Sequence, residues 1–179
     1  LTFECGLPGL SEPALPFAIL GLAMASGWVA RFVAGVAVTV MAGRSLNSRS
    51  HRASIHGVDC RVVTDPSAQA FVLGLVRPRI YVTGPVITAL DRAAQRAVLL
   101  HEDHHRRTRA PLRTLIIASW SDTIGRIPGS YDVLQRRLSR LEEDADRHAL
   151  MHGARRSDLA RALLAMEAHG AGTATSSIG

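Results

Sequence analysis

The stretch that decides the fold is AVLLHEDHHRR, residues 97–107, where an apolar run leads directly into three histidines and two acids. Asp91, six residues before this stretch, is suited to cap the N-terminus of a helix, so a helix is predicted from about residue 92 to residue 107. One face of that helix would carry Ala94, Ala97, Val98, His101 and His105, which recur at helical spacing. Titratable chemistry is therefore expected on the face that meets the core.

His101 and His105 are four residues apart, about 6 Å along a helix axis. Two imidazoles so placed can reach one ion at about 2.0–2.1 Å. Glu102 lies beside them as the candidate catalytic base and completes the H-E-x-x-H pattern of zinc peptidases. Chance is the alternative, with a match expected in about one sequence in a hundred of this composition. Asp103 and His104 point elsewhere on the helix and are expected to be exposed.

A second helix is expected after Pro128 and Gly129, in YDVLQRRLSRLEEDADRHALMHG. Its apolar stripe consists of Leu134, Leu138, Leu141, Ala145 and Ala149. Glu142 and Asp146 lie one turn apart along one edge of this stripe, so Glu142 could be a third ligand and Asp146 could hold a ligand imidazole. Glu143 points about 100° away, to the polar side. Alone, such an acidic run is more often solvated, but its place after the H-E-x-x-H helix favours a metal site.

Three short β-prone runs precede the first helix: CRVVTD at 60–65, AQAFVLG at 68–74 and RPRIYVTG at 77–84. Three short strands make only a small sheet, so we expect them to pack on the metal-binding helix. AFVLG, residues 70–74, is the expected open edge beside the metal. The predicted fold class is α+β, with a short sheet on a metal-binding helix, a second acidic helix, and one further helix in SDLARALLAMEAHG.

Residues 14–43 form an apolar stretch with a single charge, Arg31. About 20 apolar residues suffice to cross a bilayer, and the small residues here are typical of membrane helices. A buried helix broken by glycines is one alternative. A secretory signal is another, which fits poorly because the basic residues follow the apolar run. Arg31 could snorkel, face a partner helix, or mark the end of a shorter span at Ala30.

The flanks of this stretch are charged asymmetrically. Residues 44–52 carry three arginines and no acid, whereas residues 1–13 carry two acids and no base. Positive flanks tend to stay in the cytoplasm. We therefore expect an extracytoplasmic segment at 1–13, a transmembrane helix at 14–43, a basic cytoplasmic linker at 44–57, a catalytic domain at 58–170 and a disordered tail at 171–179. The chain would contact membrane lipid.

Composition excludes several other classes. The net charge is +6, but the arginines are dispersed and aromatic residues make up only 4% of the chain, so no nucleic-acid partner is expected. Cys5 and Cys60 are far apart, which argues against a disulfide scaffold or a cysteine zinc site. The chain begins with Leu1, as a processed chain or a piece of a longer one would.

The order and spacing of these motifs over residues 58–152 resemble the membrane-bound antirepressor metallopeptidases of the BlaR/MecR type. SRLEEDADRHAL resembles the E-x-x-x-D element of that family and of the related HtpX-type peptidases. The resemblance implies a small gluzincin domain attached to membrane helices in the bacterial inner membrane. In it His101, His105 and Glu142 match the Zn2+ ligands, Glu102 matches the catalytic base and Asp146 matches the aspartate of the second motif.

The implied activity is that of a membrane-anchored zinc endopeptidase acting on a protein substrate, which for some members is a transcriptional repressor. This chain departs from the family at Ala110, where an aspartate is common, and at His104, where a small apolar residue is common. A non-cleaving zinc sensor or scaffold would share every feature and is the alternative. No oxyanion donor can be assigned, since the candidates His148, His152 and Arg147 are expected at the surface.

Overall fold

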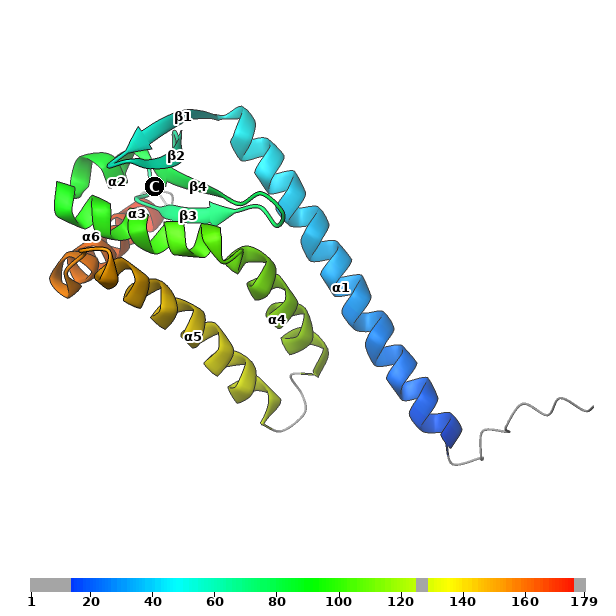
Figure 1. Cartoon of the computed structure of the whole chain (residues 1–179). Coiled ribbons are helices and arrows are strands. Elements are labelled where there is room, and N and C mark those ends of the chain that lie inside the picture. The colour runs from blue at the N-terminus through cyan, green and yellow to red at the C-terminus, as the bar shows by residue number, and fades with distance from the viewer. Residues whose placement is uncertain (1–13, 125–128, 176–179) are drawn as a thin grey trace, which may run out of the picture.

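The structure, a computed structural model, describes residues 14–124 and 129–175 and confirms the α+β class (Figure 1). Its helices are α1 (Ala14–Ser48), α2 (Gly84–Ala89), α3 (Arg92–Arg107), α4 (Ala110–Ile124), α5 (Ser130–Met151) and α6 (Arg156–Thr175). Its strands are β1 (Ser50–Ile55), β2 (Val58–Val63), β3 (Ala70–Leu73) and β4 (Arg79–Thr83). The expected extracytoplasmic segment and the last residues of the expected tail, 176–179, lie outside the described residues.

The four strands form one sheet in the order β1-β2-β4-β3. β2 and β4 are parallel, and each outer strand is antiparallel to its neighbour. β1 and β2 are joined by His56 and Gly57, both at positive φ, the two-residue turn whose twist matches that of a hairpin. Gly74 begins the β3–β4 turn at φ +113°, where a Cβ would lie 3.0 Å from the Arg77 carbonyl oxygen. The strand order places β3 at the edge of the sheet, as predicted.

Residues 44–57 are not a linker, which corrects the sequence prediction. α1 continues past Gly43 to Ser48, and β1 follows and pairs with β2 from Ser50↔Val63 to Ile55↔Val58. The sheet consequently has four strands where three were expected. β1 was missed because its sequence, SHRASI, carries few apolar residues, as an outer antiparallel strand with a solvated face can.

The sheet packs on α3, and the core lies between them. Ile80 and Val82 of β4 are almost fully buried there, against Ala94, Val98 and Leu99 of α3. The α3 boundaries are those predicted, and the Asp91 side chain caps the helix by accepting a hydrogen bond from the Ala94 N–H at 2.8 Å. α6 packs against α3 as well and runs to Thr175, past the expected start of a disordered tail at residue 171.

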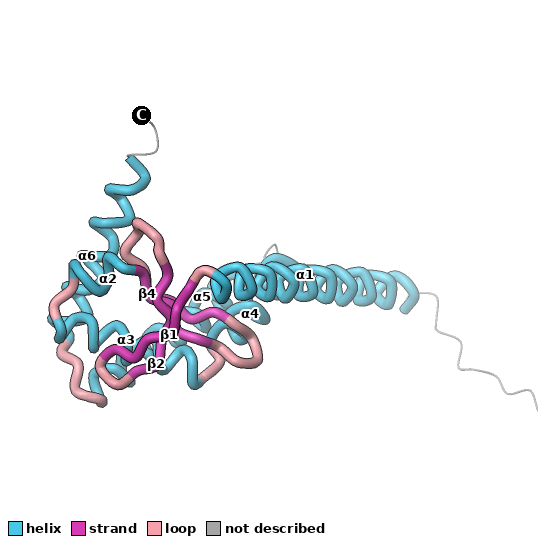
Figure 2. The backbone as a smooth tube through the Cα atoms, turned by 90° about the horizontal axis from the view of Figure 1, so that it is seen from above, coloured by secondary structure: helices cyan, strands magenta, loops and turns pink. Residues whose placement is uncertain are grey.

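α1 extends away from the sheet, and α4 lies alongside α1 (Figures 1 and 2). Trp28 of α1 meets Trp120 of α4 with ring centroids 5.4 Å apart, and a Cβ on Gly35 would collide with the Leu115 side chain. Among the described helices, α1 alone is long and apolar enough to cross a membrane, with a mean hydropathy of 1.7 over its most apolar window. α4 was not expected from the sequence.

Candidate metal centre

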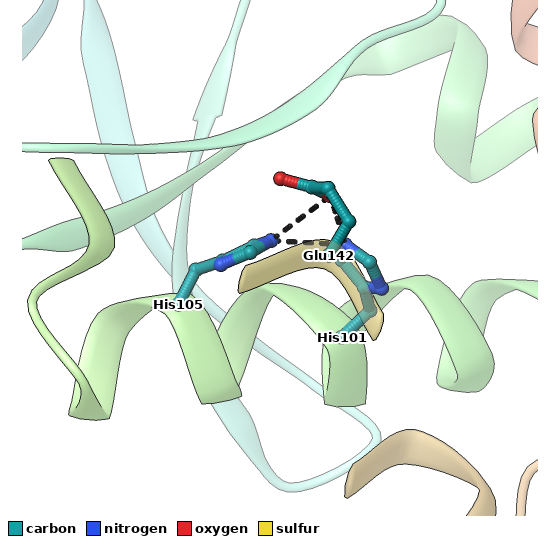
Figure 3. A group of neighbouring side chains, drawn as sticks. All are labelled: His101, His105 and Glu142. Carbon is teal, nitrogen blue, oxygen red and sulfur yellow. Dashed lines mark hydrogen bonds and ion pairs between the residues drawn. The ribbon is translucent and has the colours of Figure 1, made fainter. Parts of the chain in front are cut away.

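The predicted metal ligands come together where α3 packs beside α5 (Figure 3). His101 and His105 project from α3 with their Nε2 atoms 3.0 Å apart. Glu142 reaches in from α5, its Oε2 atom 3.4 Å from His101 Nε2 and 3.5 Å from His105 Nε2. The three donor atoms thus form a compact triangle that could hold a metal ion.

The size of this triangle fits zinc. Four ligands at about 2.1 Å around a tetrahedral zinc ion lie about 3.4 Å from one another. The separations of 3.0, 3.4 and 3.5 Å are close to that value. Two imidazole nitrogens and one carboxylate oxygen are also the donors of known catalytic zinc sites, which keep a fourth position open.

Asp146 orients one of the imidazoles. Its Oδ1 atom lies 2.9 Å from His101 Nδ1 and accepts a hydrogen bond from it. That bond directs the opposite nitrogen, Nε2, toward His105 and Glu142, as carboxylates behind metal-bound histidines do. The sequence predicted that Asp146 could hold a ligand imidazole, and in the structure Asp146 lies within hydrogen-bond distance of His101.

His105 lacks such a partner among the described residues. Its Nδ1 atom is buried and makes no hydrogen bond there. Ala110, the position at which the BlaR/MecR family commonly has an aspartate, is buried and lines the same cavity as His105. The departure seen in the sequence thus lines the same cavity as the histidine whose Nδ1 has no acceptor among the described residues.

The titratable groups of the centre shift one another's pKa values. Hydrogen bonds from His101 and His105 hold the pKa of Glu142 well below its usual range. Burial alone would lower the pKa of His101, but the hydrogen bond to Glu142 and the nearby carboxylates outweigh it and raise that pKa. Burial raises the pKa of Glu102 to about 7, against the opposing effect of the two histidines. A carboxylate with a near-neutral pKa suits a general base.

An open cavity of about 240 Å³ adjoins the centre. It is lined by Val72 of β3, Glu102 and His105 of α3, Ala110, Pro111 and Thr114 of α4, and Glu142 of α5. The sheet edge and the candidate ligands therefore face one space. Pro111 and Thr114 were not predicted because the helix that carries them was missed, since its segment LIIASW, residues 115–120, is apolar without a helical period.

Two predicted placements differ in the structure. Asp103 was expected at the surface but is buried, and its carboxylate forms ion pairs with Arg106 and Arg107 at 2.6 Å. Those pairs neutralise a charge that would otherwise be costly to bury. His104 was also expected to be exposed and is half-buried, with its ring centroid 4.9 Å from that of His148.

The acidic helix has the predicted register. Ala145 and Ala149 of its expected apolar stripe are fully buried. Glu142 faces the histidines, whereas Glu143 lines a separate hollow between α5 and α6. The sequence matches no protein-family model and no curated protein, so the chemistry of these side chains carries the functional argument.

Proposed function

We propose that this protein is a membrane-anchored zinc endopeptidase of the BlaR/MecR type. In this proposal His101, His105 and Glu142 bind the zinc ion, and Glu102 is the catalytic base. The observation that supports it best is the spacing of the three donor atoms, 3.0 to 3.5 Å, in the range that tetrahedral zinc requires.

The side chains have separate roles in the proposed hydrolysis. A zinc ion in this position supplies Lewis acidity, which acidifies a water molecule and polarises the scissile carbonyl. Glu102, with a pKa of about 7, accepts a proton as the water oxygen bonds to the carbonyl carbon. It then returns the proton to the leaving amine as the C–N bond breaks. Asp146 keeps the His101 ring oriented throughout.

The edge of β3 offers a binding surface for an extended substrate. Thr83 N donates to Gln69 O at 2.9 Å, which marks Gln69 and Thr83 as a hydrogen-bonded pair of the antiparallel ladder. Such pairs alternate along a ladder, so the backbone N–H and C=O of Val72 point away from β4. Val72 also lines the cavity beside Glu102 and His105. A substrate strand could bond there with little demand on its sequence.

Zinc binding without cleavage is the second candidate function. The buried His105 Nδ1 with no partner in the described part of the chain favours it, because a ligand imidazole without such a partner can cost activity at a centre that still holds metal. A transcriptional repressor as substrate, a cytoplasmic catalytic domain and the bacterial inner membrane as location all follow from the resemblance and the flanking charges, and belong to the same proposal.

Metal analysis and proteolysis on detergent-purified variants test the assignment. Wild type should bind one zinc at this centre and cleave an unfolded protein such as casein. Glu102→Gln should keep the zinc and lose cleavage, because it removes the base and no ligand. Glu142→Ala should lose most of the zinc, since two histidines are too few ligands. Glu143→Ala is the matched control and should keep both.

The outcomes separate the two candidate functions. Zinc in wild type with no cleavage of any protein substrate would favour the scaffold. Wild type without zinc, or zinc lost from Glu143→Ala and kept in Glu142→Ala, would refute the proposed centre.

A further inference from the structure

A second group of imidazoles lies beside the centre just described. His104 projects from α3, and His148 and His152 project from the C-terminal end of α5. The His104 and His148 ring centroids are 4.9 Å apart, and those of His148 and His152 are 3.9 Å apart. The His104 ring is 6.4 Å from the ring of His105, so the two groups are adjacent but distinct. The proposed hydrolysis uses none of these three residues.

Close packing of α3 and α5 brings the rings together. Ala97 of α3 and Ala149 of α5 are fully buried in one cluster, and small side chains let two helices approach closely. His148 and His152 are four residues apart, so both lie on one side of α5, and His104 meets them from α3. Figure 1 shows the two helices side by side.

We propose that His104, His148 and His152 form a second binding site for a divalent transition metal, linking α3 to α5. Imidazole donors suit zinc, copper and nickel. Two imidazoles on one tetrahedral ion have ring centres about 5 Å apart when the metal–nitrogen bonds are about 2.0–2.1 Å. The 4.9 Å between His104 and His148 agrees with that spacing. The His148 and His152 rings lie closer together, at 3.9 Å, so the exposed His152 ring must rotate away from His148 and toward His104 before all three can bind one ion.

A hydrogen bond to the backbone leaves one nitrogen of His152 with a free lone pair. Its Nδ1 atom lies 2.8 Å from the His148 carbonyl oxygen, which can only accept. Nδ1 must therefore carry the proton, and Nε2 is the free nitrogen that can bind metal. A backbone carbonyl behind a metal-binding histidine is a common arrangement.

The charges around the three histidines affect how tightly they can bind a metal ion. Burial and the neighbouring His152 and His104 lower the pKa of His148, which keeps its ring neutral, as metal binding requires. Arg107 is close enough to contribute to that shift, but its guanidinium is paired with the buried Asp103. The cluster holds no carboxylate ligand, so its metal should bind more weakly than the one held by His101, His105 and Glu142.

Metal stoichiometry of the full chain tests this site independently. The protein should be produced without a polyhistidine tag, stripped of metal and titrated with Zn2+. Wild type should bind two equivalents, one tight and one weaker. His148→Ala/His152→Ala should lose the weaker equivalent and keep the tight one. His51→Ala/His56→Ala, which removes two exposed histidines from the β1–β2 hairpin, is the control and should bind two.

Further variants separate this site from the first. His101→Ala/Glu142→Ala should lose the tight equivalent and keep the weaker one. If it keeps both while His148→Ala/His152→Ala loses one, the second site stands and the proposed catalytic centre fails. His152→Ala alone changes an exposed side chain and should weaken the second site without disturbing the fold. A single equivalent in wild type, or a second that survives the loss of His148 and His152, would overturn the inference.

Discussion

Asp146 acts on the candidate centre through one hydrogen bond. Its carboxylate accepts from His101 Nδ1 at 2.9 Å, and its side chain is half exposed, so replacing it should not disturb the core. We expect Asp146→Ala to weaken zinc binding by about 10- to 100-fold, the usual effect of losing such a partner. Asp146→Asn keeps an acceptor oxygen and should lose less. Competition against a fluorescent chelator measures both, and equal losses in the two variants would show that the hydrogen bond is not what orients His101.

The open edge of strand β3 is the proposed binding surface for an extended substrate. Val72→Pro should remove a backbone donor that points away from β4, while edge strands otherwise tolerate proline. One lost hydrogen bond of about 0.5–1.5 kcal/mol corresponds to a roughly two- to twelvefold lower kcat/KM. Zinc content should not change. Val72→Ala keeps the N–H and controls for the lost side chain, and cleavage by Val72→Pro at the rate of Val72→Ala would move substrate binding to another edge.

The contact between α1 and α4 depends on a small residue. A side chain at Gly35 would meet Leu115, whereas a Cβ at Gly27 meets nothing within 4 Å. Gly35→Val should therefore push α4 from α1 and destabilise the protein by about 1–3 kcal/mol, as overpacking does. Gly27→Val makes the same change in helix propensity and should be nearly neutral. Thermal unfolding in detergent compares them, and equal shifts would mean that the α1–α4 contact contributes nothing to stability.

At the scale of the whole molecule, α1 is the element that would relate the proposed catalytic centre to a membrane. At 1.5 Å per residue its 35 residues span about 52 Å, longer than a hydrocarbon core of about 30 Å. The helix can thus cross a bilayer and still project beyond it. α4 covers one side of α1 from Trp28 to Gly35, which places the start of the cavity-lining helix next to the apolar stretch.

Thiol labelling in intact cells tests the proposed orientation. Cys60 is buried and burial raises its pKa, so it should not react in the folded protein. Cys5 precedes α1 in the sequence and should react with an impermeant maleimide if that end is outside. A cysteine at the exposed position Ser48, in a Cys5→Ser background, should react only after the cells are opened. The reverse pattern would invert the topology.

Local sequence was enough to predict the parts of the candidate centre that lie on single helices. The pairing of His101 with His105 follows from a period of 3.6 residues, and the start of α3 follows from the capping preference of Asp91. The choice of Glu142 over Glu143 combined that period with the resemblance of the acidic helix to the E-x-x-x-D element. The open edge at β3 was likewise expected from its place next to the helix. These features depend on neighbours in the chain, which periodicity reports directly.

Only the tertiary structure decided what depends on how the elements pack and pair with one another. β1 is a strand because β2 pairs with it, since its own polar residues would not predict one. Asp103 is buried by the elements around α3, which its own position on the helix did not predict, and Arg106 and Arg107 of the same helix neutralise its charge. The small residues along α1 and α5 allow other helices to pack closely against them. At Gly35, for example, the missing side chain leaves room for Leu115 of α4. Packing partners far along the chain leave no periodic signal, so the sequence predicted the chemistry of the site and the fold determined what surrounds it.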